Sequence, residues 1–130
     1  MQRIIKFRGK KIDTGEWIYG CYGCAREYVD NGGIEHLYRD GFIMLHYIVD
    51  VDGKSEMVDE QTVGQYTGLK DKNGVEIFEG DIIKNPIYKD KEIVVYDLED
   101  CGFFAKSTIG NMLYSINKNA IVIGNVHDNA

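Results

Sequence analysis

The sequence predicts a mainly β protein with little helix, and its turn residues and apolar alternation carry that prediction. Fifteen glycines against one proline indicate many tight turns between short strands. Several short segments alternate apolar and polar residues with a period of two, as half-buried strands do. The densest turn chemistry lies in residues 67–84 (TGLKDKNGVEIFEGDIIK), where two turns flank a short apolar alternation. We expect this stretch to be a scaffold hairpin and not an active site.

The N-terminal part is expected to hold a β-hairpin followed by a variable insertion. Residues 3–8 alternate apolar with basic residues, and residues 16–22 predict a second strand. In the second strand Trp17, Tyr19 and Cys21 share one face, while Ile18, Gly20 and Tyr22 share the other. Because both faces are apolar or aromatic, we expect another layer or another subunit to cover this strand. Residues 23–41 predict an irregular excursion with a small hairpin at 31–33, and residues 42–51 predict a strand.

The C-terminal part predicts short strands joined by tight turns. Strands are expected at 91–97, 103–106 and 120–126, and a short helical turn is expected within 107–119. Five strands from about residue 66 onward suit a small antiparallel barrel of SH3-like size, because closure hides exposed strand edges. The expected organisation is therefore an N-terminal β-rich region (1–60) with an insertion at about 23–56, and an SH3-like barrel region (61–130), together forming one compact unit.

Composition and charge exclude several classes of protein. The net charge is −6, and each half is acidic, with 8 basic against 11 acidic residues in 1–60 and 7 against 10 in 61–130. This balance argues against bulk DNA binding, which depends on Lys and Arg. No apolar run is long enough for a membrane-spanning helix, and the first residues lack the apolar core of a secretion signal. We therefore expect a cytoplasmic protein without membrane contact.

The three cysteines include one short motif, Cys21-Tyr22-Gly23-Cys24. Thiolates at this spacing can share a zinc ion, but a structural zinc site needs four ligands and the chain has no second such pair. A redox role needs a thiol of lowered pKa, typically at a helix N-terminus, whereas this pair follows a strand. Structural or incidental thiols are favoured, metal binding and redox chemistry stay open, and we expect no metal site.

The titratable residues form no convergent catalytic set in the sequence. His46 lies in the apolar run 42–51, where a core or interface histidine is favoured, and His36 and His127 lie far from it. Two acidic groups favour solvated turns over metal sites, because neither has the ligand spacing of a calcium loop. They comprise Asp97, Glu99 and Asp100, and Asp50, Asp52, Glu56, Asp59 and Glu60. We expect no catalytic residues, no cofactor and no enzymatic activity.

A basic and aromatic group near the N-terminus is the one candidate for nucleic-acid contact. Single-strand binders combine cations with stacking rings, and this group has both. A solvated strand face remains the favoured interpretation on an acidic protein. The group comprises Lys6, Arg8, Lys10, Lys11, Trp17 and Tyr22.

The central run resembles the YopX family of bacteriophage and prophage proteins. It reads T-V-G-Q-Y-T-G-L-K-D-K-N-G-V-E-I-F-E-G-D-I-I at 62–83, with V-I-G-N-V at 122–126. The opening I-K-F-R-G (5–9) and W-I-Y (17–19) also fit, so the resemblance spans almost the whole chain. It implies a phage or prophage origin and a mainly β fold with an SH3-like barrel, but it supplies no activity, cofactor or catalytic residue.

The function expected from these observations is that of a phage accessory protein. We expect a non-enzymatic protein-binding module that forms a homo-oligomer and contacts an unknown phage or host protein. The alternative is a nucleic-acid-associated factor that uses the barrel and the basic first strand.

Overall fold

The computed structural model describes residues 3–28, 42–87, 90–110 and 112–128. The chain divides into two compact units, and each is treated by itself. The N-terminal unit is Lys6–Val63, and the C-terminal unit is Gly64–Ala130 together with Met1–Ile5. Within the described part of the chain, no helix is long and apolar enough to span a membrane.

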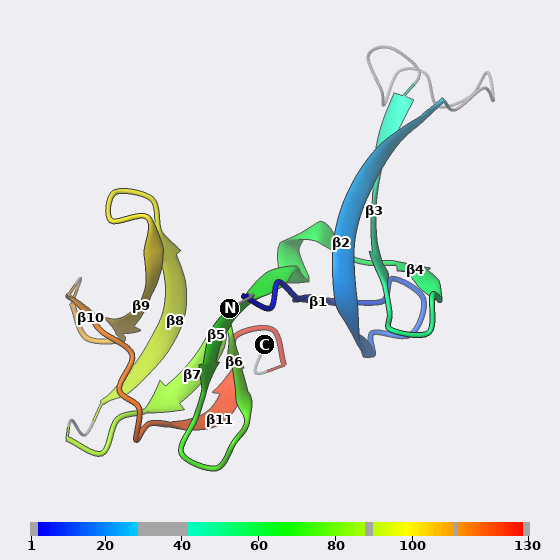
Figure 1. The fold of residues 1–130 in the computed structure, drawn as a ribbon. Coiled ribbons are helices and arrows are strands. Elements are labelled where there is room, and N and C mark those ends of the chain that lie inside the picture. The colour runs from blue at the N-terminus through cyan, green and yellow to red at the C-terminus, as the bar shows by residue number, and fades with distance from the viewer. Residues whose placement is uncertain (1–2, 29–41, 88–89, 111, 129–130) are drawn as a thin grey trace. The chain divides into compact units, whose positions relative to one another are not determined.

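The N-terminal unit is an antiparallel sheet with the strand order β4-β3-β2-β1 (Figure 1). A short 3-10 turn, η2 (Glu60–Thr62), ends the unit, and the Asp59 side chain caps it by accepting from the backbone N–H of Gln61. The core lies on one face of the sheet, where Ile18, Ile48 and Val58 are buried. The strands are β1 (Phe7–Lys10), β2 (Trp17–Tyr28), β3 (Phe42–Val49) and β4 (Ser55–Met57).

The second strand is longer than the sequence predicts. The expected irregular excursion at 23–41 is wrong for 23–28, because β2 continues to Tyr28 and pairs residue by residue with β3 from Cys21↔Val49 to Tyr28↔Phe42. The apolar run 42–51 supplies this partner strand, and ladder pairing outweighs the weak strand propensity of the glycines in β2. The small hairpin expected at 31–33 lies outside the described residues.

The C-terminal unit contains an open five-stranded antiparallel sheet, with the order β10-β9-β8-β7-β11, and the β5–β6 hairpin (Figure 1). Its core is Ile77, Ile83, Val94, Ala105 and Ala120. Successive strand residues alternate between this core and the solvent, as in Asp81–Lys84. The strands are β5 (Gly64–Lys70), β6 (Glu76–Phe78), β7 (Asp81–Lys84), β8 (Lys91–Asp97), β9 (Gly102–Ser107), β10 (Leu113–Tyr114) and β11 (Ile121–Asn125).

Two C-terminal expectations need correction. In the described strands β10 and β11 are the edges of the sheet, so these strands form an open sheet and not the closed barrel that was predicted. The helical turn expected within 107–119 is also wrong for the described residues, where the short strand β10 pairs with β9. Met112, Leu113 and Ile116 gave only a weak helical pattern, and pairing with a long neighbouring strand overrides such a pattern.

The core face of the five-stranded sheet holds a buried carboxyl group, that of Glu92. The residue is 2% exposed and pairs with Ile83 and Ser107, and neither carboxyl oxygen has a hydrogen-bond partner among the described residues. Burial raises the pKa of Glu92, and the nearby Asn85 side chain acts against that shift. A buried carboxyl without hydrogen bonds destabilises the folded state when it is ionised.

Removing this charge is expected to stabilise the C-terminal unit. Because the folded-state pKa of Glu92 is raised, the unfolding free energy should fall as the pH rises above the unfolded pKa of about 4.3. Glu92→Gln should flatten that decline, and Glu92→Met should also remove the unpaired polar atoms. Each should gain about 1–2 kcal/mol at pH 7 in urea unfolding.

The matched control is Glu99→Gln, at an exposed turn position. It should keep the pH profile of the unaltered protein between pH 4 and 8. If the unfolding free energies of the unaltered protein and of Glu92→Gln changed in parallel with pH, this would contradict the assignment of Glu92 as a buried carboxylate that destabilises the folded state.

Candidate functional site

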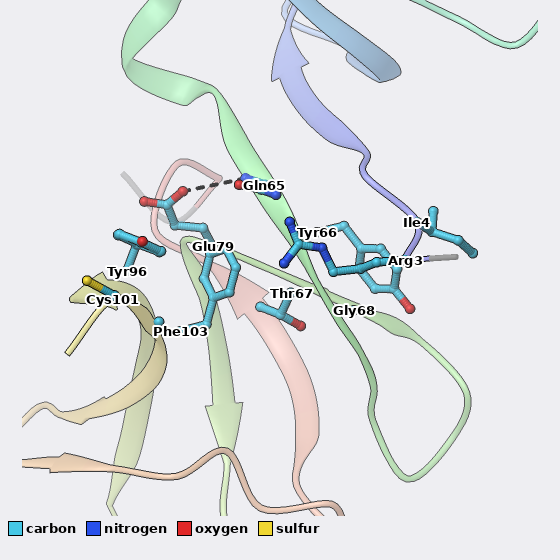
Figure 2. A pocket seen from close by; sticks show the side chains of 11 residues that line it. Arg3, Ile4, Gln65, Tyr66, Thr67, Gly68, Glu79, Tyr96, Cys101 and Phe103 are labelled. Atoms are coloured by element: carbon cyan, nitrogen blue, oxygen red, sulfur yellow. Dashed lines mark hydrogen bonds between the residues drawn. The ribbon is translucent and has the colours of Figure 1, made fainter. Parts of the chain in front are cut away.

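A cavity of about 480 Å³ lies in the C-terminal unit. Its walls come from three fixed elements: Gln65–Gly68 on β5, Glu79 in the turn between β6 and β7, and the adjoining ends of β8 and β9, which supply Tyr96, Cys101, Gly102 and Phe103. Arg3 and Ile4, from the segment before β1, complete the lining. Figure 2 shows the Arg3 guanidinium pointing into the cavity between these walls.

The cavity combines three aromatic rings with one charge of each sign. Tyr96 and Phe103 meet edge to face with ring centroids 5.2 Å apart, and Tyr66 is the third ring. The Glu79 carboxylate accepts a hydrogen bond from the backbone N–H of Gln65 at 3.4 Å, drawn in Figure 2. Such a lining can hold a cationic group by its rings and its carboxylate.

One of the two acidic groups noted in the sequence lies in the turn beside this cavity. The Asp97 carboxylate accepts from the backbone N–H of Asp100, and the Cys101 thiol donates to the carbonyl of Leu98 at 3.5 Å. Cys101 has a positive φ of 51°, which is uncommon for a residue other than glycine. These contacts support the interpretation of Asp97, Glu99 and Asp100 as a solvated turn.

The second acidic group is also engaged in local turns. The Asp50 carboxylate accepts from the backbone N–H groups of Asp52 and Lys54, and Lys54 pairs with Glu56 at 3.5 Å. Asp59 caps η2. Over the residues that the structure describes, no three His, Cys, Asp or Glu side chains form a group suited to a metal ion.

His46 lies in a chain of three polar side chains within the N-terminal unit. Its Nδ1 is 2.6 Å from the Tyr22 hydroxyl, and its Nε2 is 3.3 Å from the Glu60 carboxylate. The rings of Tyr22 and His46 also stack, with centroids 5.9 Å apart. Burial raises the pKa of Tyr22, and the charges of Cys24 and Glu60 add to that effect.

This chain is not arranged for nucleophilic catalysis. A raised pKa keeps the Tyr22 phenol protonated, and its hydroxyl shares a hydrogen bond with Nδ1 while Nε2 faces Glu60. A catalytic phenol needs the opposite shift. The predicted interpretation of His46 as a satisfied histidine at the border of the core agrees with this geometry, whereas His36 lies outside the described residues.

Cys21 and Cys24 are both exposed and lie on β2, where they pair with Val49 and His46. Residues three apart on a strand point to opposite faces and are separated by roughly 10 Å along it. The two thiols therefore do not converge on one metal ion in this strand. His127 is far from them in sequence, and its backbone N–H donates to the Asn125 side chain after β11.

The predicted basic and aromatic group is only partly assembled. The Arg8 guanidinium lies 4.6 Å from the centroid of the Trp17 ring, and the Lys10 ammonium lies 5.4 Å from it. Arg8 is 6% exposed, so its charge is directed to the ring and not to solvent. Tyr22 is on the opposite face of β2, with Phe7, and so does not join them.

The outer face of the N-terminal sheet is largely apolar. Register places Tyr47 between Gly23 and Met57, and Val49 beside Cys21. Tyr19 is 44% exposed and Met57 45% exposed. We call this the outer apolar face, and it comprises Trp17, Tyr19, Ala25, Ile43, Leu45, Tyr47, Val49 and Met57.

The fold and these sites define a class of antiparallel β protein with two compact units and almost no helix. Comparison with protein families matches residues 6–130 to the family described as YopX protein. The chain therefore belongs to the YopX family, which confirms the resemblance seen in its sequence.

One solved structure is similar to this chain over most of its length. It is the crystal structure of protein EF1440 from Enterococcus faecalis, with 26% sequence identity and a TM-score of 0.49. The match covers 98% of this chain and 96% of that chain. The comparison with curated proteins gave no match.

Sequence reasoning did not find the cavity. Its residues come from four separate segments, and none of them has an unusual composition by itself. The one available signal was the aromatic pair Tyr96 and Phe103, which flank the acidic turn.

Proposed function

We propose that this YopX-family protein is a non-enzymatic phage or prophage accessory protein that binds other proteins and forms a homo-oligomer. The observation that carries the proposal is the outer apolar face of the N-terminal sheet. The opposite face of the same sheet already covers the core of Ile18, Ile48 and Val58. A contiguous exposed apolar surface is characteristic of a protein–protein interface.

The composition of this face supports a subunit interface. It contains two tyrosines, a tryptophan and a methionine, residue types that are enriched where proteins meet. The register also places Glu27 on this face, opposite Ile43, so an acidic residue lies at its edge. The C-terminal unit, with short antiparallel strands and tight turns, supports an SH3-like relationship as a further part of the proposal.

The oligomer is tested by solution mass. The protein should have a mass well above 14.8 kDa by light scattering at micromolar concentration. Met57→Asp puts a charge on the outer apolar face and should shift the protein to a monomer, because burying an unpaired charge is costly.

The matched control for this test is Met44→Asp. Met44 is 53% exposed and pairs with Arg26, so it lies on the opposite face of the sheet. This variant should keep the oligomeric mass. A clean monomer for the unaltered protein, or equal effects of the two variants, would remove the outer apolar face as the interface.

A nucleic-acid-associated role is the alternative, and it would use the basic first strand. Arg8 and Lys10 both lie over the Trp17 ring, and this weighs against a nucleic-acid role. The ring already makes cation–π contacts within the protein, so neither the ring nor the Arg8 guanidinium is available for a nucleic acid. The alternative requires salt-sensitive binding of single- or double-stranded DNA. Absence of binding at low salt in a gel-shift titration would exclude it.

A further inference from the structure

The cavity of the C-terminal unit is lined by fixed walls and by Arg3, which belongs to no strand. Glu79, Tyr66, Tyr96 and Phe103 are held by strands or the tight turns between them. Arg3 lies in the segment before β1, where residues 3–6 form no strand and Arg3 to Ile5 are exposed. No strand ladder therefore holds Arg3 in place, whereas the walls depend on the sheet.

The fixed walls select a positive charge. They present a carboxylate and three aromatic rings, and among the described residues of the lining the only cation is Arg3. A planar guanidinium suits such a site, because it pairs with carboxylates and stacks on rings. Arg3 lines the cavity with its guanidinium pointing inward, so a group of this size and charge reaches these walls (Figure 2). The protein's net charge of −6 favours the approach of a basic partner.

We propose that this cavity is a recognition pocket for an arginine side chain of a partner protein, and that Arg3 is an internal occupant that the partner displaces. The proposal concerns the C-terminal unit and is independent of the outer apolar face. Competition by Arg3 lowers the apparent affinity in proportion to the fraction of time the pocket is filled. Removing the Arg3 side chain should therefore strengthen binding of the partner's arginine.

The test is an NMR titration of the full chain with the blocked tripeptide acetyl-Gly-Arg-Gly-amide. Arg3→Ala should show saturable shifts of the backbone amides of Gln65, Thr67 and Gly102. Its affinity should exceed that of the unaltered protein by about tenfold if Arg3 fills the pocket nine-tenths of the time. The same peptide with citrulline, which has the same shape without the charge, should not saturate.

Two further variants separate the pocket from general charge attraction. Glu79→Gln keeps an oxygen that can accept from Gln65 N–H, and in the Arg3→Ala background it should weaken the tripeptide by about tenfold, the value of roughly one charged hydrogen bond. Glu16→Gln removes the same charge at an exposed position outside the lining, and should leave the affinity unchanged.

Three results would overturn the proposal. The first is the absence of saturable shifts with Arg3→Ala in a protein whose spectrum shows it is folded. The second is equal affinity for the arginine and citrulline peptides. The third is preferential binding of acetyl-Gly-Asp-Gly-amide by the unaltered protein and its loss in Arg3→Ala, since Arg3 would then be the recognition element.

Discussion

Gly20→Ala is expected to disrupt the N-terminal unit, with a loss of roughly 3–5 kcal/mol in unfolding free energy. A Cβ at position 20 would lie 1.9 Å from the carbonyl oxygen of Val49, far inside van der Waals contact. The clash is with backbone, so no side-chain rotation relieves it. It occurs where β2 begins to pair with β3, at Cys21↔Val49. The two strands would have to separate, which would disturb the core at Ile18 and Ile48.

The measurement uses the single tryptophan of the chain, Trp17, which lies on β2 and reports on this unit by fluorescence during urea unfolding. Gly23→Ala is the matched control on the same strand. Its Cβ would meet only the Tyr47 ring at 3.7 Å, an ordinary contact, so its stability should stay within about 1 kcal/mol of the unaltered protein. Similar stability of Gly20→Ala and Gly23→Ala would contradict the close approach of β2 to Val49.

Asp71→Ala is expected to cost the C-terminal unit roughly 3 kcal/mol, because one buried carboxylate satisfies three backbone donors. One oxygen accepts from the N–H groups of Asn73 and Val75, at 2.8 and 2.9 Å, and closes the turn. The other accepts from Val122 N–H at 2.9 Å and joins this turn to β11. Gly74 completes the turn with a φ of +82°, which glycine adopts without steric cost.

The lowered pKa of Asp71 also predicts that the protein loses stability in acid. Burial by itself raises the pKa of this carboxyl, but the N–H groups of Val122, Val75 and Asn73 outweigh it and hold the pKa below its usual value. An acid with a depressed folded-state pKa stabilises the protein above its unfolded pKa of about 3.9, and that contribution is lost as the pH falls further. Circular dichroism during urea unfolding at pH 7 and pH 3 should show a smaller effect of Asp71→Ala at pH 3.

Asp50→Ala is the matched control for Asp71→Ala. Asp50 closes a turn through the N–H groups of Asp52 and Lys54, which lie two and four residues further along the chain. Its loss should cost about 1 kcal/mol. If the two substitutions were equally costly, the bond from Asp71 to Val122 would have no special role in stability.

The stretch 67–84 shows which features of the fold could be predicted from the sequence. Its Asn and Gly residues predicted tight turns, and the turns at 71–74 and 79–81 are present. The strand at 91–97 was predicted to the residue, because it is a short run of β-branched and aromatic residues followed by turn residues. The role of Asp71 was not predictable, because its partner Val122 lies 51 residues away.

The candidate sites were less accessible to sequence reasoning. The alternation of β1 correctly placed Arg8 and Lys10 on one face, but their stacking on Trp17 required the register Arg8↔Tyr19 and Lys10↔Trp17. The contact of Tyr22 with His46 spans 24 residues and follows from the pairing of β2 with β3. The outer apolar face needed the same pairing to bring Tyr47 and Met57 together.

By itself, the sequence determined the mainly β character, the positions of the tight turns and membership of the YopX family. Those properties depend on local backbone preference, on the period of apolar residues and on a contiguous motif. Only the tertiary structure decided that the C-terminal sheet is open, that Glu92 is buried and that Arg3 enters a cavity lined by Glu79 and three aromatic rings. Each of these depends on contacts between residues distant in sequence, whose pairing no local pattern records.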